Sequence, residues 1–277
     1  MAKKDSQPLV SVIMATYNEP VEYLSQAVDS ILGQTHDHLE LLIADDSTSQ
    51  ATIQMIDDYA LRDNRVVVIR GENRMGVAGA RNEALKKAKG ELIALMDADD
   101  ISLRDRLEKQ VRYAGENQDI DLFGGHIYII DGHNRVTSQR KYKVDNKQFM
   151  RMFAYRNPLA HPTIMFRRSI VDSGFLYDPT YKRAEDLEFY LRLFNNGYRL
   201  GNMDEFLLNY RIIGDMQKKR QSDNWQYNHK ARSKNFNWHY PAFSLISWIT
   251  SCVYLRMPNK IISFLYKREN NKKFHAT

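Results

Sequence analysis

Three carboxylates stand close together in the segment Asp97-Ala98-Asp99-Asp100, which directly follows an apolar run. Carboxylates at this spacing repel one another, so a fold gains little from them unless something neutralises their charge. A hard divalent cation, with phosphate oxygens completing its octahedral coordination, would remove the conflict. The alternative is that the acids cap a neighbouring helix. We favour the first interpretation, and the segment therefore predicts a site for a metal ion and a diphosphate group.

Two common phosphate-binding sequences are missing from the chain. It has no G-x-x-x-x-G-K-[ST] loop, and no G-x-G-x-x-G follows the first predicted strand. The segment Gly76-Val77-Ala78-Gly79, at an expected helix start, could offer backbone N–H groups to a phosphate instead. Arg81, one turn further along, is either a bidentate partner for the same anion or an ordinary surface arginine.

The first hundred residues alternate between strand and helix patterns. Short β-branched runs at residues 10–14, 39–44, 66–69 and 92–96 predict buried strands. Apolar residues at helical spacing separate them, as in Leu24, Ala27, Val28 and Ile31. The repeat of just under 30 residues predicts a parallel, doubly wound sheet with right-handed crossovers.

Polar residues follow each of these strands. In an open α/β sheet, ligands bind beyond the carboxyl ends of the strands, so these residues are expected to share one edge. Alternative interpretations remain: Asp45 or Asp46 could cap the next helix, and Tyr17 could be a half-buried packing residue. The polar segments are Ala15-Thr16-Tyr17-Asn18-Glu19, Asp45-Asp46-Ser47, Asn73-Arg74-Met75-Gly76 and the acidic segment at 97–100.

The pattern is looser after residue 100. We expect helices at 103–117 and 187–196, the second closing at Gly197, and strands at 122–130 and 206–213. Asp186 precedes the second helix, where an acid can serve as a helix N-cap.

The order and spacing of several segments resemble the family 2 glycosyltransferases with a GT-A fold. The resemblance covers roughly residues 10–211 and is to bacterial enzymes that build O-antigen, capsule and other surface polysaccharides. It implies a Rossmann-like α/β fold with a mostly parallel sheet flanked by helices. The segments are VSVIMATYNE, LLIADDSTS, NRMGVAGARNEALKKAKGELIALMDADD, HPTIMFRRSIVDSGF and AEDLEFYLRLFNNGY.

The resemblance implies an inverting transfer of a sugar from a nucleotide-sugar, with UDP expected, to a hydroxyl of a lipid-linked glycan. Asp99, with Asp97, would bind Mn²⁺ or Mg²⁺. Asp186 matches the position of the general base, which would take the proton of the acceptor hydroxyl, and Glu185 is the second candidate for that role. A sugar nucleotidyltransferase is the alternative enzyme, but it normally carries a glycine-rich loop with a basic residue after the first strand. The expected nucleotide-sugar site contains Ala15, Thr16, Tyr17, Asn18, Glu19, Asp46, Gly76, Arg81, Asp97 and Ala98.

Two positions qualify the resemblance. Family members often carry a histidine shortly after a Tyr-Arg pair, which can complete the metal site. Here Tyr210-Arg211 is followed by Ile212-Ile213-Gly214, so isoleucine stands at that place. His161 is family-like, and it either lines the acceptor pocket or is a structural histidine held by its turn.

The net charge of +6 is unevenly distributed along the chain. From residue 217 onward there are 12 Lys or Arg and only Asp223 and Glu269 as acids, whereas the earlier part has 28 Lys or Arg and 32 Asp or Glu. We therefore expect a catalytic domain at 1–215 and a basic, aromatic, helical extension at 216–277. The apolar block at 242–255 would span about 21 Å as a helix, short of a bilayer core of about 30 Å.

These features predict interfacial helices on an anionic membrane, at its cytoplasmic, inner face. The alternative is a helical subdomain whose aromatic residues pack on the catalytic domain. A nucleic-acid-binding tail is a third interpretation, against which the apolar block argues. A single cysteine, Cys252, indicates a reducing compartment, and we expect no signal peptide and no spanning helix. The oligomeric state is not indicated.

Overall fold

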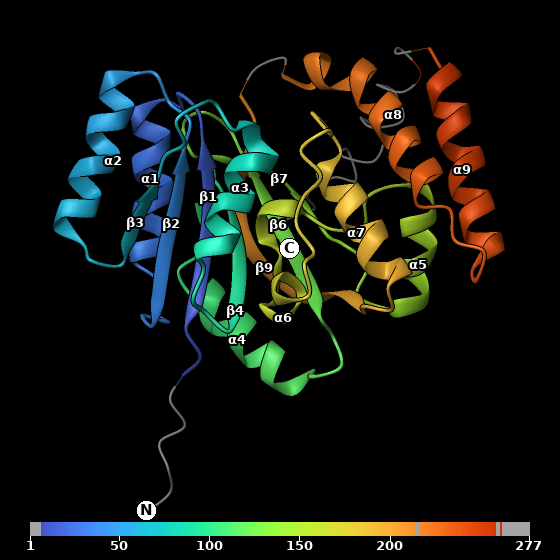
Figure 1. Cartoon of the computed structure of the whole chain (residues 1–277), viewed down its shortest axis with the longest axis horizontal. Helices are drawn as coiled ribbons and strands as arrows, with labels where there is room; N and C mark the ends of the chain where they lie inside the picture. Colours follow the sequence, from blue (N-terminus) through green and yellow to red (C-terminus); the bar gives the residue numbers. More distant parts are fainter. Residues whose placement is uncertain (1–6, 214–215, 259–260, 262–277) are drawn as a thin grey trace, which may run out of the picture.

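The computed structural model describes residues 7–213, 216–258 and 261, with the side chains of 216–224 left out. These residues form a nine-stranded sheet flanked by helices (Figure 1). The strands are β1 (Val10–Thr16), β2 (Leu39–Asp45), β3 (Val66–Ile69), β4 (Leu92–Asp97), β5 (Ile101–Ser102), β6 (Leu122–Ile130), β7 (Val136–Arg140), β8 (Met165–Arg167) and β9 (Leu200–Arg211). The helices are α1 (Val21–Leu32), α2 (Gln50–Arg62), α3 (Gly76–Lys87), α4 (Arg106–Glu116), α5 (Asn146–Tyr155), α6 (Ser169–Asp172), α7 (Glu185–Asn195), α8 (Met216–Lys234) and α9 (Pro241–Arg256), with a 3-10 turn η1 at His161–Thr163.

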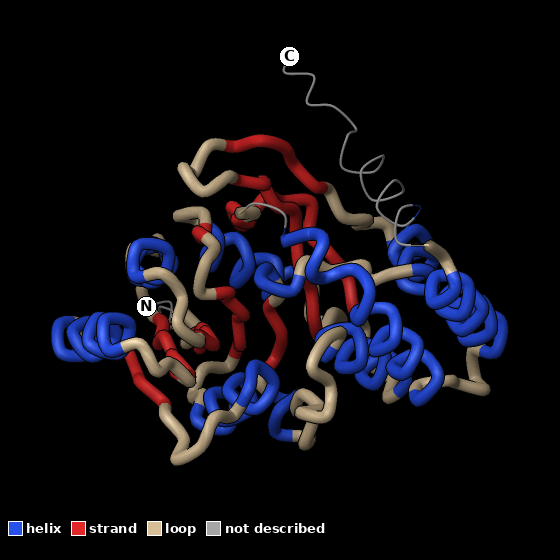
Figure 2. Tube along the Cα trace, turned by 90° about the horizontal axis from the view of Figure 1, so that it is seen from above, coloured by secondary structure: helices blue, strands red, loops and turns tan. Residues whose placement is uncertain are grey.

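The first four strands pair in parallel in the order β3-β2-β1-β4, as the repeat predicts. Their side chains alternate between two cores. Ile13 of β1 packs with α3 on one face of the sheet, while Val12 and Met14 pack with α1 and α4 on the other. Figure 2 shows helices on both sides of these strands. Burial on both faces explains why the strands are continuous apolar runs.

The second half of the sheet is mixed. Strand β8 lies antiparallel between β4 and β6, and β9 runs parallel to β6. Strand β9 begins at Leu200, six residues before the expected start, because it pairs with β6 along most of that strand. The register shifts at Gly124 and Gly125, where a Cβ on Gly125 would lie 2.6 Å from the side chain of Leu207. Glycine at this position therefore permits the close approach of the two strands.

The C-terminal region is helical, and it packs at one end of the sheet beside α5 and α7 (Figure 1). Trp225 of α8 stacks on Tyr254 of α9 with 4.0 Å between ring centroids. Phe243 of α9 packs against Phe153 of α5 and Phe194 of α7. The alternative interpretation, that tail aromatics pack on the catalytic domain, thus holds for Phe243, whereas Trp225 and Tyr254 stack on each other within the extension. No helix in the described ranges has the length and apolar character that a membrane span requires.

Candidate active site

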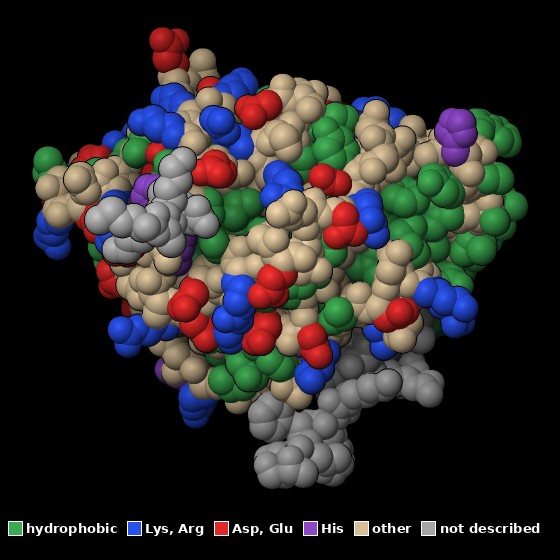
Figure 3. All heavy atoms as spheres, turned by 90° about the horizontal axis from the view of Figure 1, so that it is seen from below, with side chains coloured by type: hydrophobic (Ala, Val, Ile, Leu, Met, Phe, Trp, Pro, Cys, Tyr) green, Lys and Arg blue, Asp and Glu red, His purple; other side chains and the backbone are tan. Residues whose placement is uncertain are grey.

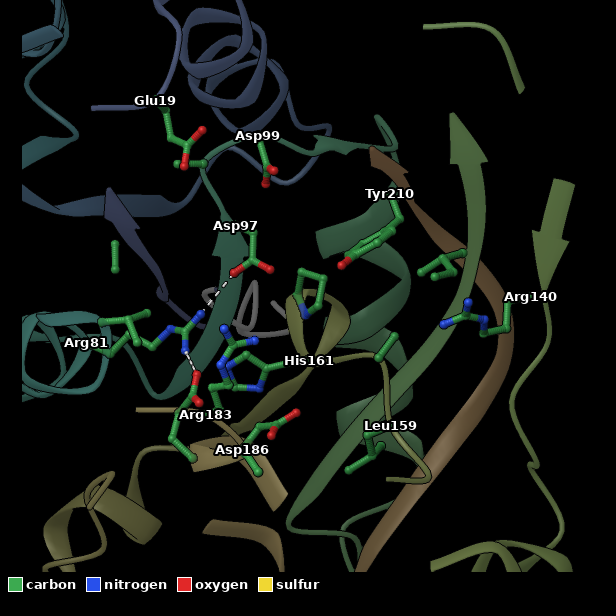
Figure 4. Close-up of a pocket in the computed structure, with 18 of the residues that line it drawn as sticks. Glu19, Arg81, Asp97, Asp99, Arg140, Leu159, His161, Arg183, Asp186 and Tyr210 are labelled. Atoms are coloured by element: carbon green, nitrogen blue, oxygen red, sulfur yellow. Dashed lines mark hydrogen bonds and ion pairs between the residues drawn. The ribbon is translucent and has the colours of Figure 1, made fainter. Parts of the chain in front are cut away.

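A cavity of about 690 Å³ opens beyond the carboxyl ends of β1 and β4, at the edge of the sheet predicted from the sequence (Figure 4). The turn η1, the first residues of α7 and residues of β6, β7 and β9 form its other walls. The cavity therefore brings together segments that are far apart in the sequence. Nine of the predicted residues line it: Ala15, Glu19, Arg81, Asp97, Ala98, Asp99, His161, Glu185 and Asp186.

The other predicted residues lie around this cavity rather than on its wall. Asn18 has a positive φ of 53°, and its Oδ1 accepts hydrogen bonds of 2.8 Å from the backbone N–H groups of Thr48 and Ser49. Asp46 accepts hydrogen bonds from the backbone N–H groups of Met75 and Gly76, at 3.1 and 2.7 Å. Asn18 and Asp46 therefore tie together the loops that follow β1, β2 and β3.

The helix-capping interpretation of Asp45 and Asp46 is wrong, because Ser49 caps α2 by accepting from the backbone N–H of Thr52. Asp45 instead pairs with Arg70 at 2.8 Å. Thr16 is buried, and Gly76 begins α3 with a φ of 68°.

Tyr17 is not a packing residue in this structure, since 41% of its surface is exposed. The guanidinium carbon of Arg74 lies 3.8 Å from the centre of its ring. The pair forms a flat, exposed platform close to the loops that Asn18 and Asp46 connect. A planar, uncharged ring system is the kind of group that stacks on such a surface.

The crowded acids are neutralised in part by the protein itself. Asp97 pairs with Arg81 at 3.0 Å. Asp100 is fully buried and accepts a hydrogen bond from the backbone N–H of Arg211 at 2.8 Å; its burial, and then the charge of Asp99, raise its pKa well above the usual value. Asp99 lies in the cavity (Figure 4). Repulsion by Asp99 and Asp97 therefore favours the protonated form of Asp100, and the two acids that line the cavity are Asp97 and Asp99.

Arg81 joins two parts of the site that are distant in sequence. One terminal nitrogen donates to Asp97 at 3.0 Å and the other donates to Glu185 at 2.9 Å. The arginine is nearly buried, at the contact between α3, the end of β4 and the start of α7. Its ion pairs hold the acidic segment and the Glu185-Asp186 pair at a fixed distance from each other, an arrangement that the sequence did not predict.

Helix α7 places Asp186 at the cavity. The helix begins at Glu185, two residues earlier than expected, after Ala184, which has a positive φ of 55°. Asp186 therefore lies inside the first turn, and the N-cap interpretation is wrong. Asn157 donates a hydrogen bond of 2.5 Å to its Oδ2. Burial, and then the negative charge of Glu185, raise the pKa of Asp186 to about 7. A carboxylate with this pKa can accept a proton near neutral pH.

His161 is both held by the protein and open to the cavity. Its Nδ1 lies 2.7 Å from the hydroxyl of Tyr190, and the ring of Tyr177 meets it edge-on at 5.7 Å. Burial, and then the positive charge of Arg81, lower the pKa of His161 well below its usual value, so the ring is neutral. Within the described part of the chain, its Nε2 has no hydrogen-bond partner.

Several lining residues were missed by the sequence analysis. Lys182 and Arg183 are separated from Glu185-Asp186 only by Ala184, and this proximity was an available signal. Arg140, from the end of β7, reaches the cavity only because β7 pairs with β6, so no local pattern could have revealed it. Tyr210, of the Tyr-Arg pair, also lines the cavity. Figure 4 shows Arg140 and Tyr210 on the wall opposite Arg81.

The residues present suit a hard divalent cation. Asp97 and Asp99 bring carboxylate oxygens to the cavity, and such oxygens are the ligands that Mg²⁺ and Mn²⁺ prefer. Among the described residues, no three or more His, Cys, Asp or Glu side chains are arranged to hold a metal ion. The side chain of Ile213 has no donor atom, so it offers no ligand in place of a histidine. The side chains in the described part of the chain therefore form an incomplete set of ligands, which oxygen atoms of a diphosphate would complement.

Comparisons with known proteins agree with this geometry. The family model described as glycosyl transferase family 2 matches residues 11–175. An uncharacterised glycosyltransferase of Methanocaldococcus jannaschii is 37% identical over 216 residues, which are 76% of this chain and 73% of the relative. The O-antigen biosynthesis glycosyltransferase WbnJ of Escherichia coli is 35% identical over 214 residues, which are 76% of this chain and 82% of that protein.

Solved structures share the fold at lower sequence identity. Residues 1–349 of S. aureus TarS, in complex with UDP-GlcNAc, match with a TM-score of 0.66 and 20% identity over 88% of this chain and 72% of that chain. This chain covers 39% of a longer TarS structure. The mannosyltransferase PcManGT of Pyrobaculum calidifontis, in complex with GDP-Man and Mn²⁺, matches with a TM-score of 0.65 and 16% identity over 95% of this chain and 80% of that chain. From the family match and these relatives, the chain belongs to glycosyl transferase family 2.

Proposed function

We propose that this glycosyltransferase moves a sugar, with inversion, from a UDP-sugar to a hydroxyl of a lipid-linked glycan. The product would be part of a cell-surface polysaccharide, and the reaction would take place at the inner face of the cytoplasmic membrane. The name of WbnJ, an O-antigen biosynthesis enzyme, supports the pathway class, and the TarS complex with UDP-GlcNAc supports the nucleotide.

The observation that carries the proposal is the position of Asp186 relative to the acidic segment. In Figure 4, Asp97 and Asp99 lie on one side of the cavity and Asp186 lies on the other. A donor whose diphosphate is near Asp99 would present the opposite face of its sugar toward Asp186. An acceptor hydroxyl between the sugar and Asp186 would then be in line for a single displacement.

In the proposed transfer step, every bond that forms is matched by one that breaks, and the proton has an acceptor. The acceptor oxygen forms a bond to the anomeric carbon while the bond from that carbon to the β-phosphate oxygen breaks. The bonding electron pair leaves with UDP, and the hydroxyl proton passes to Asp186. Because the new bond forms on the face opposite the old one, an α-linked donor gives a β-linked product.

Asp186 is the better of the two predicted bases. Glu185 is held by the guanidinium of Arg81 at 2.9 Å, so accepting a proton there would weaken a nearly buried ion pair. Asp186 is instead held by the neutral amide of Asn157, and its raised pKa suits proton transfer near neutral pH.

Asp99 and Asp97 are the residues that would hold Mn²⁺ or Mg²⁺, which when bound supplies a Lewis acid that neutralises charge on the departing diphosphate. The PcManGT complex with Mn²⁺ supports this choice of metal. Arg81 keeps Asp97 oriented by its ion pair. Asn18 and Asp46 would keep the loops around the uracil and ribose in place, with Tyr17 offering a face for the base.

One experiment tests the proposal directly. The protein is incubated with Mn²⁺ and a panel of UDP-, GDP- and dTDP-sugars, and release of free nucleotide is measured with and without an undecaprenyl-diphosphate-linked sugar. We expect a UDP-sugar to be turned over, faster with the acceptor present. NMR of the product should show the anomeric configuration inverted relative to the donor. An α-linked product from an α-linked donor would contradict the single displacement.

A further inference from the structure

Helix α9 is oriented against the usual rule for a helix on a protein surface. Surface helices normally bury their apolar stripe and expose their polar one. The fully buried positions of α9 are all serines, Ser244, Ser247 and Ser251. Phe243 and Tyr254 pack inward, but six other large apolar side chains point outward, each between 40% and 51% exposed. These form what we call the outer face of α9: Leu245, Ile246, Trp248, Ile249, Val253 and Leu255.

Hydrogen bonds to the serines fix this orientation. Ser247 accepts from the buried guanidinium of Arg232, and the hydroxyl of Ser251 lies 2.9 Å from Nδ1 of His229. The backbone N–H of Asn237 donates to Ser244 at 2.9 Å. Turning the outer face inward would leave Arg232, which is only 2% exposed, without this partner. The hydrogen bonds between α8 and α9 therefore keep the apolar side of α9 facing solvent.

The outer face is continuous and carries a groove. Figure 3 shows hydrophobic side chains gathered at the end of the molecule where α9 lies. A largely apolar groove runs along the helix between Trp248 and Met257, and Arg256 lines it near the helix C-terminus. Trp238, which is 81% exposed, and Tyr240 lie just before the helix begins. Exposed aromatic rings beside an apolar strip and a basic group are typical of proteins at the membrane–water interface.

The positive charge around α9 favours a negatively charged partner. Residues 224–268 contain seven Lys or Arg and no Asp or Glu. Arg232 is buried and Lys234 pairs with Asp178 at 2.8 Å, so neither is available to a headgroup, whereas Arg256 lines the groove. Lys260, Lys267 and Arg268 lie outside the described residues. A second copy of this chain would bring the same basic segment opposite itself, with no acid in it to pair with. An anionic lipid surface offers both acyl chains for the apolar side chains and negative headgroups for the basic ones.

We infer that the outer face of α9 is a membrane-docking surface, which lies in the headgroup region of an anionic bilayer. The inference deepens the proposed function. The use of membrane binding to the enzyme rests on that function, because a lipid-linked acceptor is held at a membrane. Binding to lipid is nevertheless a property of α9, independent of catalysis.

The test is flotation of the full chain with vesicles of phosphatidylcholine alone or mixed with phosphatidylglycerol. We expect the protein to float with the anionic vesicles, and less so as salt rises, since charges exposed to water are screened. The double variant Ile249→Glu/Val253→Glu places two acids on the outer face and should reduce partitioning by about tenfold or more. Leu61→Glu, on exposed α2 at a residue that is 85% exposed, is the matched control and should float like the wild type.

A second measurement does not depend on the folding of the double variant. Brominated lipids should quench tryptophan fluorescence of the wild type, and Trp238→Phe/Trp248→Phe should remove the quenching because the remaining Trp225 is buried. The inference would be overturned if the wild-type protein did not float with anionic vesicles at low salt. An unaltered partition of the double variant, or a lipid-free dimer that the same variant dissociates, would also overturn it.

Release of UDP from the donor, measured without lipid, separates this inference from the proposed function. The double variant should match the wild type in that assay, because the outer face is not part of the cavity. If no variant and no wild type turns over any nucleotide-sugar while flotation behaves as described, the proposed function fails and the docking surface stands.

Discussion

Arg81 donates a hydrogen bond of 2.9 Å to Glu185, across 104 positions of sequence. Arg81 is on α3 and Glu185 is the first residue of α7, so the contact fixes the start of α7 against the sheet. It also separates the roles of two neighbouring acids. Glu185 is held by a cation, whereas Asp186, the next residue, is half-buried, accepts a hydrogen bond from an amide and has the raised pKa.

Replacement of Asp186 by asparagine removes the proton acceptor and keeps the shape of the side chain. We expect kcat for transfer to fall by about 10²-fold or more, which is the usual contribution of a general base. The dissociation constant for the UDP-sugar, measured by calorimetry, should stay near the wild-type value, since Asp186 acts on the acceptor.

The matched control is Glu185→Gln. This variant weakens the contact with Arg81, so we expect a change in donor binding and stability with a smaller loss of kcat. If Glu185→Gln loses kcat by two orders of magnitude while Asp186→Asn keeps it, the base is Glu185 and the assignment made here is wrong.

The pH dependence of transfer follows from the pKa of Asp186, which is raised to about 7. The base must be ionised to accept a proton, so kcat should fall as the pH drops below about 7 and level off above it. Glu185→Gln removes a nearby negative charge that favours the protonated form. Its profile should therefore shift to lower pH, as measured with saturating substrates in buffers of constant ionic strength. A wild-type profile that is flat from pH 5 to pH 8 would be incompatible with this role.

Metal removal tests the role of the acidic segment. EDTA should abolish sugar transfer by the wild-type enzyme, and added Mn²⁺ or Mg²⁺ should restore it. Asp99→Asn should abolish transfer over the same range of metal concentration, since it removes a carboxylate oxygen from a site with few protein ligands. Asp100→Asn is the control, because that carboxyl is buried with a raised pKa and contacts a backbone N–H. Undiminished turnover in EDTA would remove the metal from the mechanism.

The parallel half of the sheet was predictable because its strands and helices are each short, regular and buried on known faces. The edge where the site forms followed from it, since the carboxyl ends of parallel strands meet there. The antiparallel strand β8 was not predicted, because three residues between two other strands leave no periodic signal.

The sequence predicted which residues belong to the site better than it predicted what each one contacts. Asp186 was identified from the family resemblance, but its contact with Asn157 joins segments 29 positions apart. Arg81 was expected to face a phosphate, and its ion pairs with Asp97 and Glu185 depend on where α7 packs. Arg140 reaches the cavity only through the pairing of β7 with β6. Local sequence contains none of these tertiary contacts.

Arg211, at the end of β9, holds the acidic segment in place by hydrogen bonds to Asp99 and Asp100. Its Nε donates to the backbone carbonyl of Asp99 at 2.6 Å, and its backbone N–H donates to Asp100. Its guanidinium also donates to Gln26 and lies 4.3 Å from the centre of the ring of Tyr23. One planar group thus connects α1, the acidic segment and β9 around the proposed metal ligand.

Arg211→Lys keeps the charge but cannot make the same planar set of hydrogen bonds. We expect the backbone at Asp99 to lose its fixed position, so the Mn²⁺ concentration for half-maximal transfer should rise about tenfold or more, as for other residues that orient metal ligands. At saturating Mn²⁺, kcat and its pH profile should return toward wild type, because Asp186 is not touched. Arg199→Lys is the control, since Arg199 precedes the same strand with a largely exposed side chain. An unchanged Mn²⁺ requirement in Arg211→Lys would show that the hydrogen bond to Asp99 does not position the metal ligand.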